Sequence, residues 1–223
     1  LHIPHIPDSW KLGISMLPID NEWLKKNNEA RKYALQYIRY LEGGELKLED
    51  KEIHIISKNI NALSVNINDW VYAKSKEILD SDKIPVVLGG DHSSPYGLMR
   101  AIDENQSDFG VLHIDAHADL RPAYEGFTHS HASIMYNLLE LDHVSKLVQI
   151  GIRDLCEQEN EYIINDSRIR TFFDHNIKNQ LFEGIRWSLI VDEIIDELPD
   201  NIYLSLDVDG LDPSLCPNTG TPV

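Results

Sequence analysis

The sequence predicts an α/β protein whose mainly parallel sheet is covered by helices on both faces. Four short runs rich in branched apolar residues recur along the chain, at residues 84–88, 109–114, 147–150 and 202–206. The segments between them are long enough to hold helices, and this alternation is typical of parallel sheets. Three of the runs end in polar clusters, at the position where open α/β sheets bind their ligands.

Length, charge and cysteine content limit the domain organisation and the partners. The chain has 223 residues without a repeat or linker, so residues 1–223 are predicted to form one domain. Its net charge of −17 argues against nucleic acid and anionic membranes as partners. No apolar run approaches the ~20 residues of a membrane span. The two cysteines lack a CxxC spacing, which is typical of reduced thiols and predicts a cytoplasmic location.

The amino-terminal third is predicted to be mostly helical. Residues 11–17 are expected to form a first strand. Residues 21–41 have apolar side chains at helical spacing and are followed by two glycines, which predicts a helix. Residues 45–60 are ambiguous, because 52–57 fit either a short strand or the beginning of a helix. A second amphipathic helix then leads to a turn at residues 81–83.

Two of the polar clusters place acidic residues at alternate positions. Asp115, His117 and Asp119 directly follow a predicted strand, and an extended backbone would project all three to one side. Asp207 and Asp209 repeat this spacing at the end of another strand. The alternation predicts that both clusters face the same crevice.

His92 completes the set of candidate ligands, because it follows a diglycine turn that lets the backbone bend out of the sheet. Two imidazoles and four carboxylates form an oxygen-rich set that suits Mn²⁺ better than zinc. Four carboxylates balance the charge of two divalent ions, so two Mn²⁺ per chain are predicted, with a hydroxide between them. The remaining negative charge favours a cationic substrate such as a guanidinium.

Three segments resemble the signature segments of the ureohydrolase family of arginases and agmatinases, and they occur in the family's order. They are GGDHS at 89–93, DAHAD at 115–119 and SLDVDGLDPS at 205–214. Between them, SHAS at 130–133 resembles the agmatinase segment that carries a catalytic histidine, and QIGIR at 149–153 resembles a core strand and turn. The similarity is greatest to agmatinase-like members.

This resemblance covers residues 84–222 and implies a three-layer α/β/α sandwich that assembles as a homo-oligomer, a trimer or hexamer. It also implies the two sets of metal ligands. The first ion would be held by His92, Asp115, Asp119 and Asp207, and the second by Asp115, His117, Asp207 and Asp209.

Two catalytic roles are also implied by the resemblance. Asp119 would orient the hydroxide that attacks the guanidinium carbon, and His131 would shuttle a proton to the departing amine. A simpler interpretation of His131 is that it begins a helix for which Ser130 is the cap.

Two further residues near the predicted centre have structural interpretations. Asp91 either holds His92, as partners of metal-bound histidines usually do, or caps a helix expected to begin near Pro95. His113 points to the same side of its strand as Asp115, and a satisfied core histidine is the favoured interpretation.

The predicted function is manganese-dependent hydrolysis of a linear guanidino compound, agmatine first, to urea and an amine. The arginase-type Ser-Gly-Asn segment is absent between Asp119 and His131, which argues against arginine. Arg121 leaves room for formiminoglutamate or a guanidino acid, or else forms a surface or intersubunit ion pair.

Two other hypotheses stay open. One is a mononuclear zinc deacetylase of similar fold, although such a site needs only about three protein ligands. The other is a metal-binding pseudoenzyme or regulatory subunit. In the family, the segment that residues 219–222 resemble is followed by further elements, including an acidic residue that binds the guanidinium. This sequence stops at Val223, which motivates the second hypothesis.

Overall fold

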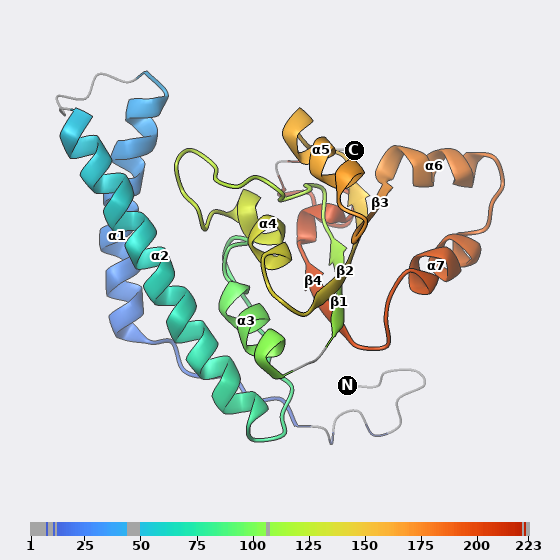
Figure 1. The fold of residues 1–223 in the computed structure, drawn as a ribbon, viewed down its shortest axis with the longest axis horizontal. Helices are drawn as coiled ribbons and strands as arrows, with labels where there is room; N and C mark the ends of the chain where they lie inside the picture. Colours follow the sequence, from blue (N-terminus) through green and yellow to red (C-terminus); the bar gives the residue numbers. More distant parts are fainter. Residues whose placement is uncertain are drawn as a thin grey trace.

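A computed structural model describes residues 8, 11, 13–43, 50–105, 108–219 and 221. At its centre lies a four-stranded sheet with the strand order β3-β2-β1-β4 (Figure 1). The strands are β1 (Phe109–Ile114), β2 (Val144–Ile152), β3 (Ile169–Phe173) and β4 (Ile202–Leu206). Every pair of neighbouring strands is parallel, so all carboxyl ends meet at one edge of the sheet.

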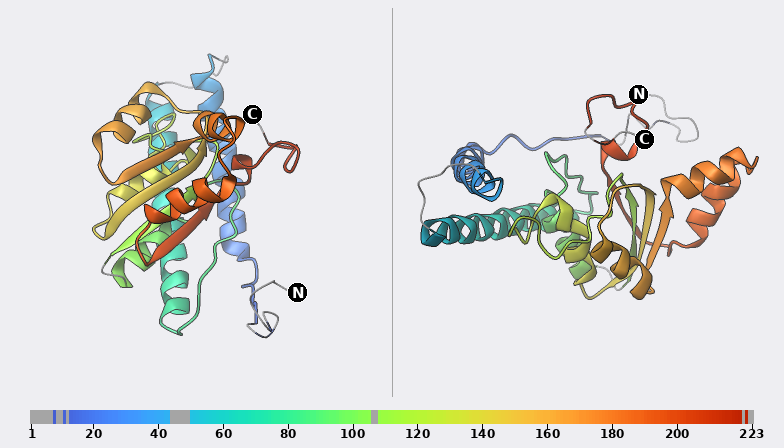
Figure 2. Two further views of the ribbon diagram at one scale, coloured as in Figure 1. Left: turned by 90° about the vertical axis from the view of Figure 1, so that its right-hand side faces the viewer. Right: turned by 90° about the horizontal axis from the view of Figure 1, so that it is seen from above.

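Helices cover both faces of this sheet and make a three-layer α/β/α sandwich (Figure 2). One face is covered by α3 (Tyr96–Asn105), α4 (Ile134–Leu139) and α5 (Glu157–Asn165). The other face is covered by α6 (Asp174–Phe182) and α7 (Trp187–Asp196). The predicted fold class is therefore confirmed.

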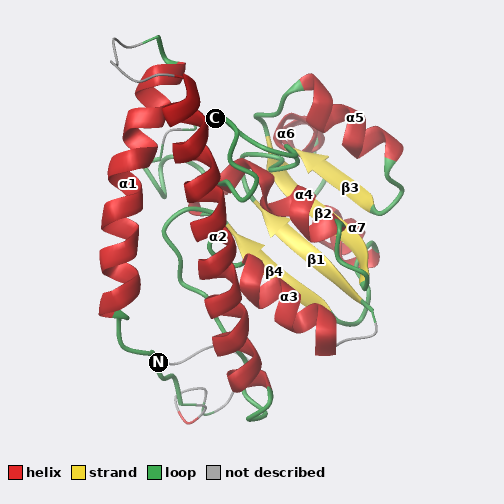
Figure 3. Cartoon of the chain, turned by 60° about the vertical axis from the view of Figure 1, so that its left-hand side comes forward, coloured by secondary structure: helices red, strands yellow, loops and turns green. Residues whose placement is uncertain are grey.

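Two long antiparallel helices, α1 (Asn21–Leu41) and α2 (Asp50–Leu79), lie outside the layer formed by α3, α4 and α5 (Figure 3). The predicted helix over residues 21–41 is confirmed, and it begins where Asp20 accepts hydrogen bonds from the backbone N–H groups of Glu22 and Trp23. Residues 52–57 are helical, which resolves the ambiguity in favour of a helix. Residues 44–49 lie outside the described part of the chain.

A close crossing joins α2 to α3 and so attaches the helical pair to the sandwich. A Cβ atom at Gly97 would lie 2.3 Å from the backbone oxygen of Asn68, so only glycine permits this approach. The helical layer that covers the sheet is thereby packed from both sides.

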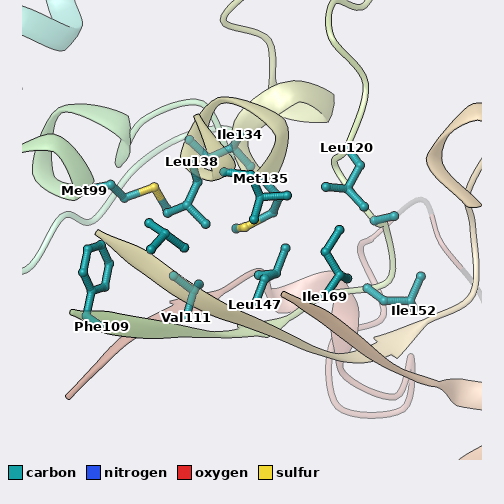
Figure 4. Close-up of a cluster of buried hydrophobic side chains, with 13 residues drawn as sticks. Met99, Phe109, Val111, Leu120, Ile134, Met135, Leu138, Leu147, Ile152 and Ile169 are labelled. Carbon is teal, nitrogen blue, oxygen red and sulfur yellow. The ribbon is translucent and has the colours of Figure 1, made fainter. Parts of the chain in front are cut away.

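The main core lies between the sheet and α3, α4 and α5 (Figure 4). Alternate residues of β1, such as Phe109 and Val111, point into it, as the two-residue period of a strand requires. They meet Met99 of α3 and Leu138 of α4. A second, smaller core joins β2 and β3 to α6 and α7. The two cores show why strands in this sheet are apolar on both faces.

Two of the predicted strands are wrong. Residues 13–17 form no strand, and Ile14 and Met16 are almost fully exposed. Residues 84–88 also form no strand, and the exposed fractions of Ile84, Val86 and Leu88 are 90%, 83% and 91%. Branched residues favour a strand, but a strand also needs a neighbour to supply hydrogen bonds, and the described residues provide none here.

Other strand predictions agree more closely with the structure. Those over residues 109–114 and 202–206 are confirmed with the same bounds, whereas β2 is longer than the predicted 147–150. β3 was not predicted, although its sequence IRTFF is rich in aromatic and branched residues. Among the described helices, none combines the length and apolar character that a bilayer crossing requires.

Candidate metal centre

Neighbouring parallel strands bring the two acidic clusters together at the carboxyl edge of the sheet. Asp115 directly follows β1 and Asp207 directly follows β4, and these strands pair as far as Ile114 and Leu206. The backbone N–H of Asp207 donates to the oxygen of Ile114 at 2.9 Å, which continues the pairing by one residue. The carboxylates thus emerge side by side.

The first group of side chains surrounds Nδ1 of His92. This nitrogen lies 2.8 Å from Oδ2 of Asp115, 3.0 Å from Oδ2 of Asp119 and 3.7 Å from Oδ2 of Asp207. His92, Asp115 and Asp119 are buried, and Asp207 is half-buried. One imidazole and three carboxylates from three chain segments therefore point at one place.

The second group adjoins the first through Asp115. Nδ1 of His117 lies 3.1 Å from Oδ2 of Asp209 and 3.4 Å from Oδ1 of Asp115. Asp115 thus presents Oδ2 to the first group and Oδ1 to the second. Asp207 lies at the margin of the first group, with Oδ2 3.7 Å from Nδ1 of His92, and its Oδ1 accepts the backbone N–H of Asp209 at 3.1 Å.

Asp119 reaches the first group by a turn and not by the extended alternation that the spacing predicts. Its φ of 55° lies in the left-handed region, which aspartate tolerates better than most residues. The backbone oxygen of Asp119 accepts hydrogen bonds from Met135 and Tyr136, at the amino end of α4. The helix therefore holds this turn in place.

The loop after β4 packs closely on the backbone of Asp115. A Cβ atom at Gly210 would lie 2.7 Å from the nitrogen of Asp115, a distance that no side chain tolerates. The guanidinium of Arg153 donates to the backbone oxygens of Asp209 at 2.6 Å and Thr221 at 3.1 Å. Glycine and arginine together hold Asp209 beside Asp115.

Close pairing shifts the pKa of the buried groups. Burial lowers the pKa of His92, but hydrogen bonds with Asp115 and Asp119 outweigh it and raise the pKa to about 10. Hydrogen bonds with Asp115 and Asp209 raise the pKa of His117 to about 10 as well. Burial raises the pKa of Asp115, but bonds from the surrounding imidazoles lower it well below its usual range. Burial raises the pKa of Asp119.

The affinity for Mn²⁺ should rise with pH between 6.5 and 8.5. With pKa values of about 10, His92 and His117 are protonated over this range in the metal-free protein. Metal binding requires neutral imidazole, so it must release protons, and each released proton strengthens binding by about tenfold per pH unit. Calorimetry at several pH values, in buffers of different ionisation enthalpy, measures both quantities. Equal affinity at pH 6.5 and 8.5 would contradict the expectation.

His92 is held by Ser205 and not by its neighbour in sequence. Nε2 of His92 lies 2.8 Å from Oγ of the buried Ser205. Asp91 instead accepts the backbone N–H of Ser93, in the turn that precedes α3. Sequence reasoning missed Ser205, although it stands two residues before Asp207 and therefore on the same side of β4.

Two residues assigned to catalysis or recognition make their contacts outside the two groups of ligands. His131 begins a short 3₁₀ helix (His131–Ser133), is exposed, and presents its ring edge-on to Tyr124 at 5.6 Å between centroids. Ser130 makes no capping hydrogen bond there. Arg121 forms an intramolecular ion pair with the buried Glu159 at 3.4 Å. None of the contacts among the described residues joins His131 to either group of ligands.

The residues present fit a pair of divalent ions. Donor atoms of His92, Asp115 and Asp119 lie within 4.8 Å of one another, as do those of Asp115, His117 and Asp209, so Asp115 belongs to both sets. The donors are imidazole nitrogens and carboxylate oxygens, a mixture that first-row divalent metals bind. His113 also lies within the first group, but both of its ring nitrogens have hydrogen-bond partners.

The fold and these adjoining groups define an α/β protein with a candidate binuclear metal centre at the carboxyl ends of its strands. The sequence model of the arginase family matches residues 21–223, and the chain belongs to that family. The match begins well before residue 84, where the sequence resemblance becomes distinctive.

Relatives and solved structures of the family agree with this assignment. An N(1)-aminopropylagmatine ureohydrolase of Thermus thermophilus is 41% identical over 145 residues, which cover 65% of this chain and 46% of the relative. The mitochondrial arginase of Medicago truncatula is 35% identical over 148 residues, covering 64% and 40%. The arginase structure of Bacillus cereus has a TM-score of 0.62 at 28% identity, covering 73% and 60%. The chain spans about half the length of the curated relatives it matches.

Proposed function

We propose that this chain forms a single ureohydrolase domain that uses two Mn²⁺ to hydrolyse a linear guanidino compound to urea and an amine. The observation that carries the proposal is the meeting of six predicted ligands, from three distant segments, in two groups that share Asp115. Parallel β1 and β4 and the turn at Asp119 hold these groups in place.

The first ion would be held by His92, Asp115, Asp119 and Asp207, and the second by Asp115, His117, Asp207 and Asp209. A pair of divalent ions lowers the pKa of a shared water and so supplies hydroxide at neutral pH. Asp119 would accept a hydrogen bond from that water and orient it. His131 would pass a proton to the departing amine, and its exposed position at the head of the 3₁₀ helix leaves the ring free to approach a substrate.

Agmatine is the proposed substrate. The carboxylates of the centre favour a cation, and the relatives include N(1)-aminopropylagmatine ureohydrolases as well as arginases. Arg121 already pairs with Glu159, which weakens the case for an acidic substrate that would need its charge. A cytoplasmic homo-oligomer remains our prediction. The homo-oligomer is supported by exposed apolar side chains on α6 and α7, such as Phe182 and Trp187.

Urea release after manganese loading tests the function directly. The panel contains agmatine, N(1)-aminopropylagmatine, arginine, formiminoglutamate and a guanidino acid, and agmatine is expected to react fastest. Two bound Mn²⁺ without turnover of any compound would favour a pseudoenzyme. One bound zinc per chain would favour a deacetylase.

His131→Ala should keep both ions and slow urea release by about 10²- to 10⁴-fold, the usual contribution of a general acid or base. Metal content and turnover are measured on the same preparation. His143→Ala is a matched control, because His143 precedes β2 at the opposite edge of the sheet. Equal slowing by both substitutions would remove His131 from the mechanism.

A further inference from the structure

A row of polar side chains, two of them fully buried, crosses β1, β2 and β3 next to the candidate metal centre. His113 of β1 is paired in register with Gln149 of β2, and Gln149 is paired with Thr171 of β3. The exposed fractions of His113 and Gln149 are both 0%. His113 lies on the same face of β1 as Phe109 and Val111, so the row crosses the face that carries the main apolar core (Figure 4). Polar groups are costly to bury there unless they are fully hydrogen-bonded.

The contacts of Gln149 determine the orientation of its amide. Nε2 lies 2.8 Å from the backbone oxygen of Ala118, which can only accept a hydrogen bond. This atom must therefore be the amide nitrogen and not the oxygen. On the opposite side, the hydroxyl of Thr171 donates to Oε1 of Gln149 at 2.9 Å. Both ends of the amide are thus satisfied in one orientation only.

The amide orientation in turn determines the tautomer of His113. The second N–H of Gln149 points at Nδ1 of His113, 3.0 Å away, so Nδ1 must accept. A neutral imidazole that accepts at Nδ1 carries its proton on Nε2. Nε2 lies 2.9 Å from Oδ2 of Asp115 and therefore donates to that oxygen.

Apart from the ligand imidazoles, Asp115 consequently has one supporting donor for each of its carboxylate oxygens. His113 donates to Oδ2, which faces the first group of ligands, and the backbone N–H of His117 donates to Oδ1 at 2.7 Å, which faces the second. These two bonds prevent the carboxylate from rotating. An imidazole with both nitrogens engaged in this way has no lone pair left to bind a metal.

We propose that His113 and Gln149 are positioning residues that orient Asp115 for metal binding, with Gln149 acting only through the tautomer of His113. The inference rests on the proposed metal role of Asp115. It assigns an effect on the metal centre to Gln149, whose side chain touches His113, Ala118 and Thr171 and no member of the ligand set.

The test is calorimetric titration of Mn²⁺ into the whole chain and three single variants. Gln149→Met removes the donor to His113 and should weaken Mn²⁺ binding by about 10- to 100-fold, as loss of a supporting partner does. His113→Asn keeps a polar group near Nδ1 but none near Nε2, and should weaken binding similarly. His113→Gln places an amide N–H near the position of Nε2 and should bind within about threefold of the parent.

A double variant separates an indirect effect from two independent ones. Because Gln149 acts through His113, the chain with Gln149→Met and His113→Asn should bind Mn²⁺ no more weakly than His113→Asn alone. Val111→Ala is the control for packing, since Val111 is fully buried on the same face of β1. It should lower the melting temperature and leave Mn²⁺ affinity unchanged.

Binding of Mn²⁺ by Gln149→Met within twofold of the parent would overturn the inference, and this variant decides the matter if His113→Asn does not fold. Additive losses in the double variant, or a loss of affinity in Val111→Ala that matches its loss of stability, would also overturn it. A parent chain that binds Mn²⁺ without releasing urea would overturn the proposed function alone. A parent chain that binds no Mn²⁺ would overturn the metal role of Asp115 on which both depend.

Discussion

Asp115→Asn should abolish metal binding at both positions of the centre and, with it, urea release. Asp115 belongs to both groups of ligands, with Oδ2 facing His92 and Oδ1 facing His117. Asparagine keeps the shape of the side chain but removes its charge, so two divalent ions would face three carboxylates where there were four. The loss should exceed the about 10- to 100-fold that supporting partners cost. Metal analysis of the purified chain, together with Mn²⁺ titration, measures it.

Asp103→Asn provides a matched control for this variant. Asp103 is also a buried aspartate, but it accepts a hydrogen bond from the backbone of His143, beside the amino end of β2. It should retain two ions per chain. Retention of two ions by Asp115→Asn would show that Asp115 is not shared between the positions, and the proposed centre would have to be abandoned.

Gly210→Ala should also damage the centre strongly, although glycine supplies no ligand. The added Cβ would lie 2.7 Å from the nitrogen and 2.8 Å from Cα of Asp115. Backbone atoms cannot rotate away as a side chain can, so the loop that carries Asp209 must move outward. Overpacking of this kind costs about 1–3 kcal/mol of stability. Displacement of Asp209 should weaken the second metal position by at least about tenfold.

Thermal unfolding and Mn²⁺ titration of Gly210→Ala would record both effects. Gly90→Ala is the comparison, because a Cβ atom at Gly90 would meet nothing within 4 Å. It should change the melting temperature much less. A Gly210→Ala chain with the stability and affinity of the parent would mean that the loop does not need its close contact with Asp115.

Local sequence patterns correctly predicted a helix that has its own cap and two strands that pair with each other. The helix over residues 21–41 has its own cap at Asp20, and the strands over residues 109–114 and 202–206 lie beside each other in the sheet. Residues 84–88 have the same branched composition as those strands, yet form none. Strand formation depends on a hydrogen-bonding neighbour, and a neighbour distant in sequence leaves no trace in local composition.

The same distinction separates the ligands from their supports. All six candidate ligands could be predicted, because acidic residues and histidines directly after apolar strands are conspicuous. The roles of Ser205 and Gln149 could not be predicted, because serine and glutamine are common and their partners, His92 and His113, lie 113 and 36 residues away in sequence. The left-handed turn at Asp119 depends on hydrogen bonds from α4.

By itself, the sequence determined the α/β class, the strands that carry the acidic clusters and the residue types of the candidate ligands, because residue type and periodicity are local properties. The tertiary structure alone decided which oxygen of Asp115 faces which group, which residue supports His92 and how Gln149 sets the tautomer of His113. Each of these depends on distances between atoms of different strands and loops, and such distances exist only after the chain has folded.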